Sequence, residues 1–181
     1  SIEIDTNQVK DQGKKLISIF PGSRKSEIIV LMPILLDFIK LMNKKYKNIF
    51  FYFHSTKEKS QFVHSIVKES NLSNCEVVSD DKIKSYILQE SFFAVSKSGT
   101  VSLEVCNARI PSIIIYKISY INFIIVKLLV KTKYANIINF AANQEIIPEL
   151  LQYKCNPKNI FKNVDYFLQN PNKIKIQINK I

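Results

Sequence analysis

Short runs of apolar residues recur along the chain, and each is followed by small or polar residues and then by a helical pattern. Five of these runs are typical of strands: residues 15–20, 49–53, 75–78, 92–96 and 112–116. Nearly every position in them is apolar, as in strands that are buried on both faces. Because the strands alternate with helical patterns, we expect an α/β fold, a Rossmann-like parallel sheet with helices on both faces.

Several segments of the chain have apolar residues at helical spacing. Apolar residues at helical spacing predict helices over 145–152 and 158–168, and a third over 121–131 that is apolar nearly all round. Pro33 falls within the helical pattern that follows the first strand. It is expected to interrupt that helix or to restart it.

The chain is long enough for one domain with its own core. We place this domain at residues 15–170. Residues 1–14 are polar and irregular, and we interpret them as a linker or a frayed start. Residues 171–181 are interpreted as a truncated tail.

The turn after the fourth strand has the composition of an anion site. Ser98, Gly99 and Thr100 lie between that strand and a helical pattern. The start of a helix offers unpaired N–H groups and a partial positive charge. Glu104 follows Thr100 by four residues on the same helix face, where an acid would suit the hydroxyls of a sugar. The alternative is that Ser98 or Thr100 only caps the helix.

Polar residues follow the other strands at the same edge of the predicted sheet. Residues 21–24 come after the first strand, and His54 comes after the second. Carboxyl ends of parallel strands meet at one edge, so both should lie near residues 96–100. Arg24 and Lys25 do not suit a helix N-terminus unless an anion lies nearby, although both could simply point into water. His54 could touch a ligand, but a structural histidine is the favoured interpretation.

Composition excludes several classes of protein. The 181 residues carry a net charge of +11, but no arginine-rich or aromatic-interleaved basic motif, so no nucleic-acid partner is expected. The charge would also suit an anionic membrane surface, although Lys, Asn and Ile are abundant throughout, which favours compositional drift. The three cysteines are far apart and form no metal-binding motif, so we expect no metal site and a reducing cytoplasm.

Six segments resemble conserved motifs of one family, in the family's order. They are residues 16–24 (LISIFPGSR), 98–104 (SGTVSLE), 115–117 (IYK), 129–134 (LVKTKY), 138–141 (INFA) and 145–152 (EIIPELLQ). Each is weak alone, but together they span about residues 15–169. The sequence therefore resembles the bacterial lipid-A-disaccharide synthases, glycosyltransferase family 19.

This resemblance implies a GT-B glycosyltransferase of Gram-negative bacteria, whose C-terminal half binds UDP-2,3-diacylglucosamine. The family transfers this sugar to a lipid acceptor, 2,3-diacylglucosamine 1-phosphate, without a metal or other cofactor. By the same resemblance, Arg24 and residues 98–100 would hold the diphosphate and Glu104 the ribose. Asn139 and Gln152 match positions near the donor site. The implied location is cytoplasmic, peripheral on the inner face of the inner membrane.

The chain also departs from the family. Full members are roughly twice as long, and the N-terminal half, with the acceptor groups and the expected catalytic base, is missing. The isolated chain is therefore expected to be inactive, with no catalytic residue of its own. It could be an excised fragment or the product of a split or decayed gene.

Two other classes of protein stay open. One is a different GT-B enzyme, either a MurG-like transferase or a UDP-sugar epimerase. The other is a non-catalytic basic module that binds lipid or a partner. Apolar residues at 123–129, flanked by lysines, suit an interfacial helix. The favoured alternative is that this helix belongs to the core or packs on the missing half.

Overall fold

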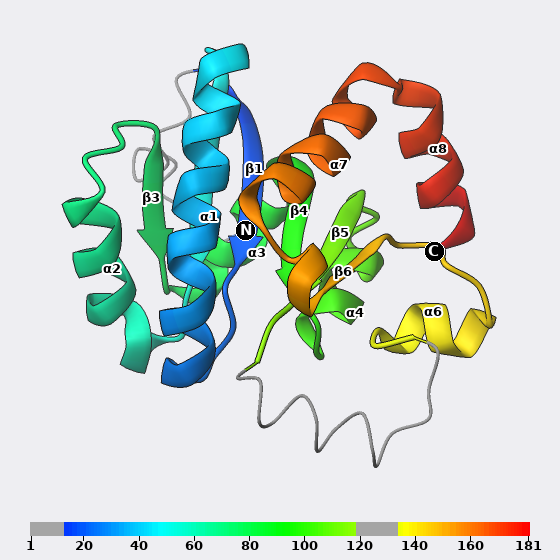
Figure 1. The fold of residues 1–181 in the computed structure, drawn as a ribbon, viewed down its shortest axis with the longest axis horizontal. Coiled ribbons are helices and arrows are strands. Elements are labelled where there is room, and N and C mark those ends of the chain that lie inside the picture. The colour runs from blue at the N-terminus through cyan, green and yellow to red at the C-terminus, as the bar shows by residue number, and fades with distance from the viewer. Residues whose placement is uncertain (1–12, 119–133) are drawn as a thin grey trace.

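The computed structural model describes residues 13–118 and 134–181 and contains one parallel sheet with helices on both faces (Figure 1). The predicted α/β, Rossmann-like fold is confirmed, and the sheet has one strand more than expected. The strands are β1 (Lys15–Phe20), β2 (Ile49–His54), β3 (Cys75–Val78), β4 (Ser91–Lys97), β5 (Ser112–Tyr116) and β6 (Glu149–Leu151).

The helices fill the connections between the strands and follow the last one. They are α1 (Lys25–Lys45), α2 (Ser60–Glu69), α3 (Asp81–Glu90), α4 (Val101–Asn107), α6 (Ile137–Ala142), α7 (Pro157–Gln169) and α8 (Pro171–Lys180). Single 3-10 turns precede α2 at Lys57–Lys59 and follow β6 at Gln152–Lys154. The helix expected over residues 121–131 and its interfacial face lie outside the described residues.

The strand order β3-β2-β1-β4-β5-β6 places the first and fourth strands side by side. All neighbouring strands are parallel, with Ile19 of β1 beside Phe53 of β2 on one side and Val95 of β4 on the other. The connections therefore run in opposite directions away from the β1–β4 pair. Between two such strands their carboxyl ends leave a crevice, which is the usual ligand site of open α/β sheets.

Alternation along each strand divides the core between the two faces of the sheet. Ile17, Phe51 and Phe93 belong to the larger apolar cluster, which includes residues of α1, α2 and α7. The intervening positions, such as Leu16 and Tyr52, belong to smaller clusters. Because both faces are covered, both sets of positions are mostly apolar, and the strands appear in the sequence as apolar runs and not as an alternation of apolar and polar residues.

The helix after β1 is continuous, contrary to the expectation that Pro33 would break or restart it. Pro33 is exposed, and so is Ile29 one turn earlier. Proline removes the hydrogen bond to the carbonyl four residues before it. On this solvent-facing side of α1, water can satisfy the carbonyl of Ile29, which explains why the helix tolerates the proline.

The helix expected over residues 145–152 is wrong, because this segment contains a bend followed by β6. Pro148 disfavours helical backbone at the residue before it. The backbone N–H groups of Ile146 and Ile147 donate to the side chain of Asn139, at 2.8 and 2.9 Å. The segment then runs parallel to β5 and adds a sixth strand to the sheet.

Candidate functional site

A cleft of about 590 Å³ lies at the carboxyl ends of β1, β2 and β4. This is the edge of the sheet at which the sequence placed a ligand site. The cleft is lined by Phe20, Gly22, Ser23, Arg24, Glu27, His54, Ser55, Thr56, Asp81, Lys84, Ser85, Leu88, Lys97, Ser98, Gly99, Thr100, Val101 and Glu104. Five of the seven predicted site residues, Arg24, Ser98, Gly99, Thr100 and Glu104, are brought together here.

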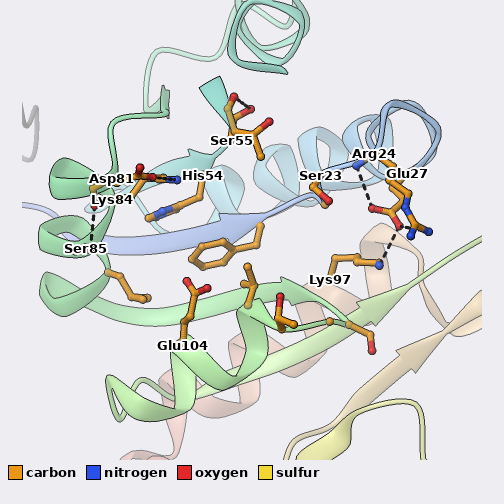
Figure 2. A pocket seen from close by; sticks show the side chains of 18 residues that line it. Ser23, Arg24, Glu27, His54, Ser55, Asp81, Lys84, Ser85, Lys97 and Glu104 are labelled. Atoms are coloured by element: carbon orange, nitrogen blue, oxygen red, sulfur yellow. Dashed lines mark hydrogen bonds and ion pairs between the residues drawn. The ribbon is translucent and has the colours of Figure 1, made fainter. Parts of the chain in front are cut away.

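The α1 end of the cleft is rich in charge (Figure 2). Arg24 is the N-cap residue of α1, and 82% of its side chain is exposed. The carboxylate of Glu27, one turn into the helix, accepts a hydrogen bond from the backbone N–H of Arg24 at 3.4 Å. This acid compensates the helix N-terminus and offsets the unfavourable placement of Arg24.

The turn formed by residues 98–100 lies between β4 and α4. The Ser98 hydroxyl donates to the backbone carbonyl of Ala135 at 2.9 Å, and therefore fixes the turn against the segment before α6. Thr100 is the N-cap residue of α4 but makes no side-chain capping bond. The Ser102 hydroxyl donates to the Gly99 carbonyl at 2.6 Å. Neither Ser98 nor Thr100 therefore makes the side-chain capping bond that the alternative interpretation requires.

Glu104 lines the cleft from α4, across from the α1 end (Figure 2). It lies one helical turn beyond Thr100, as the spacing predicted. Its side chain is exposed, and it can therefore meet a ligand without first leaving a buried partner.

His54 lies at the opposite end of the cleft from Arg24, with Asp81 and Lys84 (Figure 2). Its ring stacks on Phe20, with centroids 4.2 Å apart. Burial, with a smaller contribution from Lys84, lowers the pKa of His54 from 6.5 to about 3. The imidazole is therefore neutral at physiological pH.

A chain of hydroxyl groups fixes the tautomer of this ring. The Ser91 hydroxyl donates to the Ile87 carbonyl at 2.7 Å and must accept from Ser18, 2.7 Å away. Ser18 in turn must accept from Nε2 of His54 at 2.8 Å. Nε2 thus carries the proton and Nδ1 keeps its lone pair. This bonded, buried ring agrees with the structural interpretation of His54.

The structure keeps the last two predicted site residues, Asn139 and Gln152, out of the cleft lining. The Asn139 amide is fully buried. It accepts from the two N–H groups of the bend, and it donates to the Ile147 carbonyl at 2.6 Å and to the Glu149 carboxylate at 2.8 Å. The side-chain oxygen Oε1 of Gln152 accepts from the backbone N–H of Ile118 at 3.2 Å. Both residues shape loops at the β5–β6 side of the sheet.

Sequence reasoning missed four charged residues of the cleft as site residues: Glu27, Asp81, Lys84 and Lys97. Asp80 caps α3, and the neighbouring Asp81 pairs with Lys84 at 2.7 Å. Lys97 immediately precedes Ser98, so its position beside the predicted anion site was the available signal. Across residues 13–118 and 134–181, no group of three or more His, Cys, Asp or Glu side chains could hold a metal ion.

Solved structures share this fold over most of the chain. UDP-GlcNAc 2-epimerase from Neisseria meningitidis aligns with a TM-score of 0.63 at 15% identity, over 92% of this chain and 40% of that one. The C-terminal domain of a group 1 glycosyl transferase from Francisella tularensis gives 0.59 at 16% identity, over 98% and 89%. At sequence identities this low, the structural similarity shows a shared fold and does not show a shared function. Fold and cleft thus define the class, a Rossmann-like half of the GT-B kind.

Sequence comparison identifies the family within that class. A family profile described as lipid-A-disaccharide synthetase matches residues 2–181. The lipid-A-disaccharide synthase of Rickettsia prowazekii is 32% identical over 94% of this chain, and that of Sulfurihydrogenibium sp. is 35% identical over 92%. The chain belongs to the lipid-A-disaccharide synthase family. It spans less than half the length of these relatives, 44% and 45% respectively.

Proposed function

We propose that these residues form the sugar-nucleotide-binding half of a lipid-A-disaccharide synthase. Such a glycosyltransferase would move 2,3-diacylglucosamine from UDP to 2,3-diacylglucosamine 1-phosphate, for lipid A biosynthesis. The observation that carries the proposal is the cleft at the β1–β4 crevice, whose lining brings together Arg24, Glu104 and residues 98–100. Family membership favours this reading over a MurG-like transferase or a UDP-sugar epimerase.

The residues of the cleft suit the parts of UDP. Arg24 and the turn at residues 98–100 would hold the diphosphate, because a guanidinium and backbone N–H groups both donate to phosphate oxygens. Glu104 would accept from the two ribose hydroxyls. Asn139 and Gln152 would support this donor site from outside the cleft, through the loops that they fix.

The transfer itself requires groups beyond those of the cleft. The acceptor hydroxyl oxygen would form a bond to the anomeric carbon while the bond from that carbon to the diphosphate breaks, so that UDP leaves with the electron pair. A base must take the hydroxyl proton, and the acceptor must be held in line. We assign the base and the acceptor groups to the part of the relatives' length that these residues do not cover.

Titration of UDP into the 181-residue protein by calorimetry tests the proposal, with ADP as the control. We expect weak binding of UDP, tighter than that of ADP, and no disaccharide from the two lipid substrates. Equal binding of ADP, or no UDP binding at all, would overturn the assignment. Loss of UDP binding with retained binding to lipid would favour the non-catalytic basic module instead.

We further propose that the protein works at the inner face of the inner membrane, because its proposed substrates are acylated and its net charge is +11. No helix within the described residues is long and apolar enough to cross a membrane. Co-sedimentation with vesicles tests the peripheral location. Binding should increase with the fraction of anionic lipid, and binding that ignores this fraction would contradict an electrostatic attachment.

A further inference from the structure

Lys97, the last residue of β4, is held from two sides within the cleft. Its Nζ lies 2.9 Å from Oε1 of Glu27 and 5.5 Å from the ring centroid of Tyr116 at the end of β5. Only 21% of the side chain is exposed. An aromatic face and a carboxylate together fix the position of an ammonium group. The ammonium group of Lys97 is therefore more restricted in position than that of a surface lysine.

Glu27 is a largely buried acid close to the proposed diphosphate site. This is unusual, because a carboxylate and a diphosphate carry charges of the same sign. Its side chain is 10% exposed, and its Oε1 is also 4.0 Å from a guanidinium nitrogen of Arg24. Gly22 packs directly against it, since a Cβ at that position would lie 2.5 Å from Oε2. A buried carboxylate needs paired charges, and Lys97 is its nearer partner.

The pairing leaves part of the lysine available. An ammonium group has three N–H donors, and the contact with Glu27 uses one. Lys97 lines the same cleft as Arg24 and directly precedes Ser98. Arg24, in contrast, is mostly exposed and only loosely paired, so it must lose side-chain freedom when it binds.

We propose that Lys97 is a phosphate-binding residue of the cleft, positioned by Glu27 and Tyr116. Its two remaining donors would bind oxygens of the diphosphate from the β4 side while Arg24 closes from the α1 side. The proposal rests on the proposed function, because it names the anion as the diphosphate of UDP. In the competing explanation, Lys97 only neutralises the buried Glu27 and contacts no ligand.

Calorimetry on the 181-residue protein, with UDP, uridine and inorganic pyrophosphate as probes, separates these explanations. Lys97→Met keeps most of the volume and removes the charge. It should weaken binding of UDP and pyrophosphate about ten- to a hundredfold and leave uridine unchanged. Lys40→Met is the matched control. Lys40 pairs with Asp37 on the exposed face of α1, and its substitution removes the same net charge from the protein. It should change no affinity by more than about twofold.

The double variant Glu27→Gln with Lys97→Met covers the case in which Lys97→Met alone fails to fold. It leaves no unpaired buried charge and keeps the net charge of the protein. The loss of UDP and pyrophosphate binding should persist in it, and affinities within about twofold of the wild type would overturn the proposal. If the wild type binds pyrophosphate through Lys97 but not UDP, the proposed function fails and the phosphate site stands. If the wild type binds neither anion, both proposals fail.

Discussion

Gln177 and Ser112 exchange two hydrogen bonds that join the last helix, α8, to the start of β5. The Gln177 side chain accepts from the Ser112 N–H at 2.8 Å and donates to the Ser112 carbonyl at 3.0 Å. Both residues are buried. The amide of α8 thus occupies the place that a neighbouring strand would take. Residues 171–181, interpreted from the sequence as a truncated tail, contribute this contact to the domain.

Replacing Gln177 should therefore cost stability. We expect Gln177→Ala to lower the free energy of unfolding by about 2–4 kcal/mol, because each buried backbone group left unpaired costs about 1–3 kcal/mol. Asn179→Ala, at an exposed position on the same helix, is the control and should change it by less than about 0.5 kcal/mol. Urea denaturation measures both, and equal effects of the two substitutions would contradict the role of Gln177.

Asn139 should act as a structural residue in the same way. Asn139→Ala removes the acceptor of the Ile147 N–H, the donor to the Ile147 carbonyl and one of the two acceptors of the Ile146 N–H. We expect a loss of about 2–4 kcal/mol in the free energy of unfolding. Asn107→Ala, at the exposed end of α4, is the control. Where the variant is still folded, its UDP affinity should stay within about threefold of the wild type, and a much larger loss would indicate direct contact with the donor.

Five of the six strands were predictable from the sequence, and β6, at one edge of the sheet, was not. β1, β2 and β4 are mostly apolar because helices cover both faces of the sheet. β6 is three residues long and begins with Glu149. The bend before β6 is fixed by the side chain of Asn139, seven and eight residues earlier in the chain. The spacing of apolar residues does not reveal such a contact. The apolar spacing of Ile147 and Leu150 therefore predicted a helix where the chain forms a strand.

The cleft was predictable where it follows strand ends and small residues. Arg24 and the turn at residues 98–100 stand out because polar or glycine residues interrupt an apolar pattern. Lys97 and Glu27 do not stand out, because a charged residue at the edge of an element is common and their pairing joins two distant segments. The sequence therefore located the site but not the ion pair inside it.

The buried neutral His54 should make stability depend on pH. The native pKa is about 3 and the ordinary value is 6.5, so between these values the unfolded chain binds more protons than the native protein. Stability is thus full above pH 6.5 and falls as the pH is lowered toward 3. From pH 7 to pH 5 this one residue should remove about 2 kcal/mol from the free energy of unfolding.

Comparison of variants isolates this contribution from that of the carboxylates. His54→Gln should lose about 2 kcal/mol less than the wild type between pH 7 and pH 5, measured by urea denaturation at each pH. His64→Gln, at the exposed histidine of α2, is the matched control and should follow the wild type. If the free energy of unfolding changes with pH by the same amount in His54→Gln and in the wild type, His54 is not held neutral by the fold.

Glu104 offers the sharpest test of how the cleft would bind a nucleotide. A carboxylate can accept from two neighbouring ribose hydroxyls. One charged hydrogen bond contributes about 1.5–3 kcal/mol, and because Glu104 is exposed we expect the pair together to contribute no more than that. Glu104→Ala should then weaken UDP binding on the order of ten- to a hundredfold without unfolding the protein. It should barely change the affinity for 2′,3′-dideoxy-UDP, which has no ribose hydroxyls to lose. Glu69→Ala, an exposed acid outside the cleft, controls for the lost negative charge.

The competing role for Glu104 is purely electrostatic, as an acid in the first turn of α4. In that role it would contribute under about 1 kcal/mol to stability and would have no specific contact with the ribose. Removing it would then change the affinities for UDP and the dideoxy nucleotide by the same factor. Calorimetric titration of both proteins with both nucleotides gives the four affinities needed. Only a loss confined to UDP supports the ribose contact, because only that ligand presents the hydroxyls that Glu104 would bind.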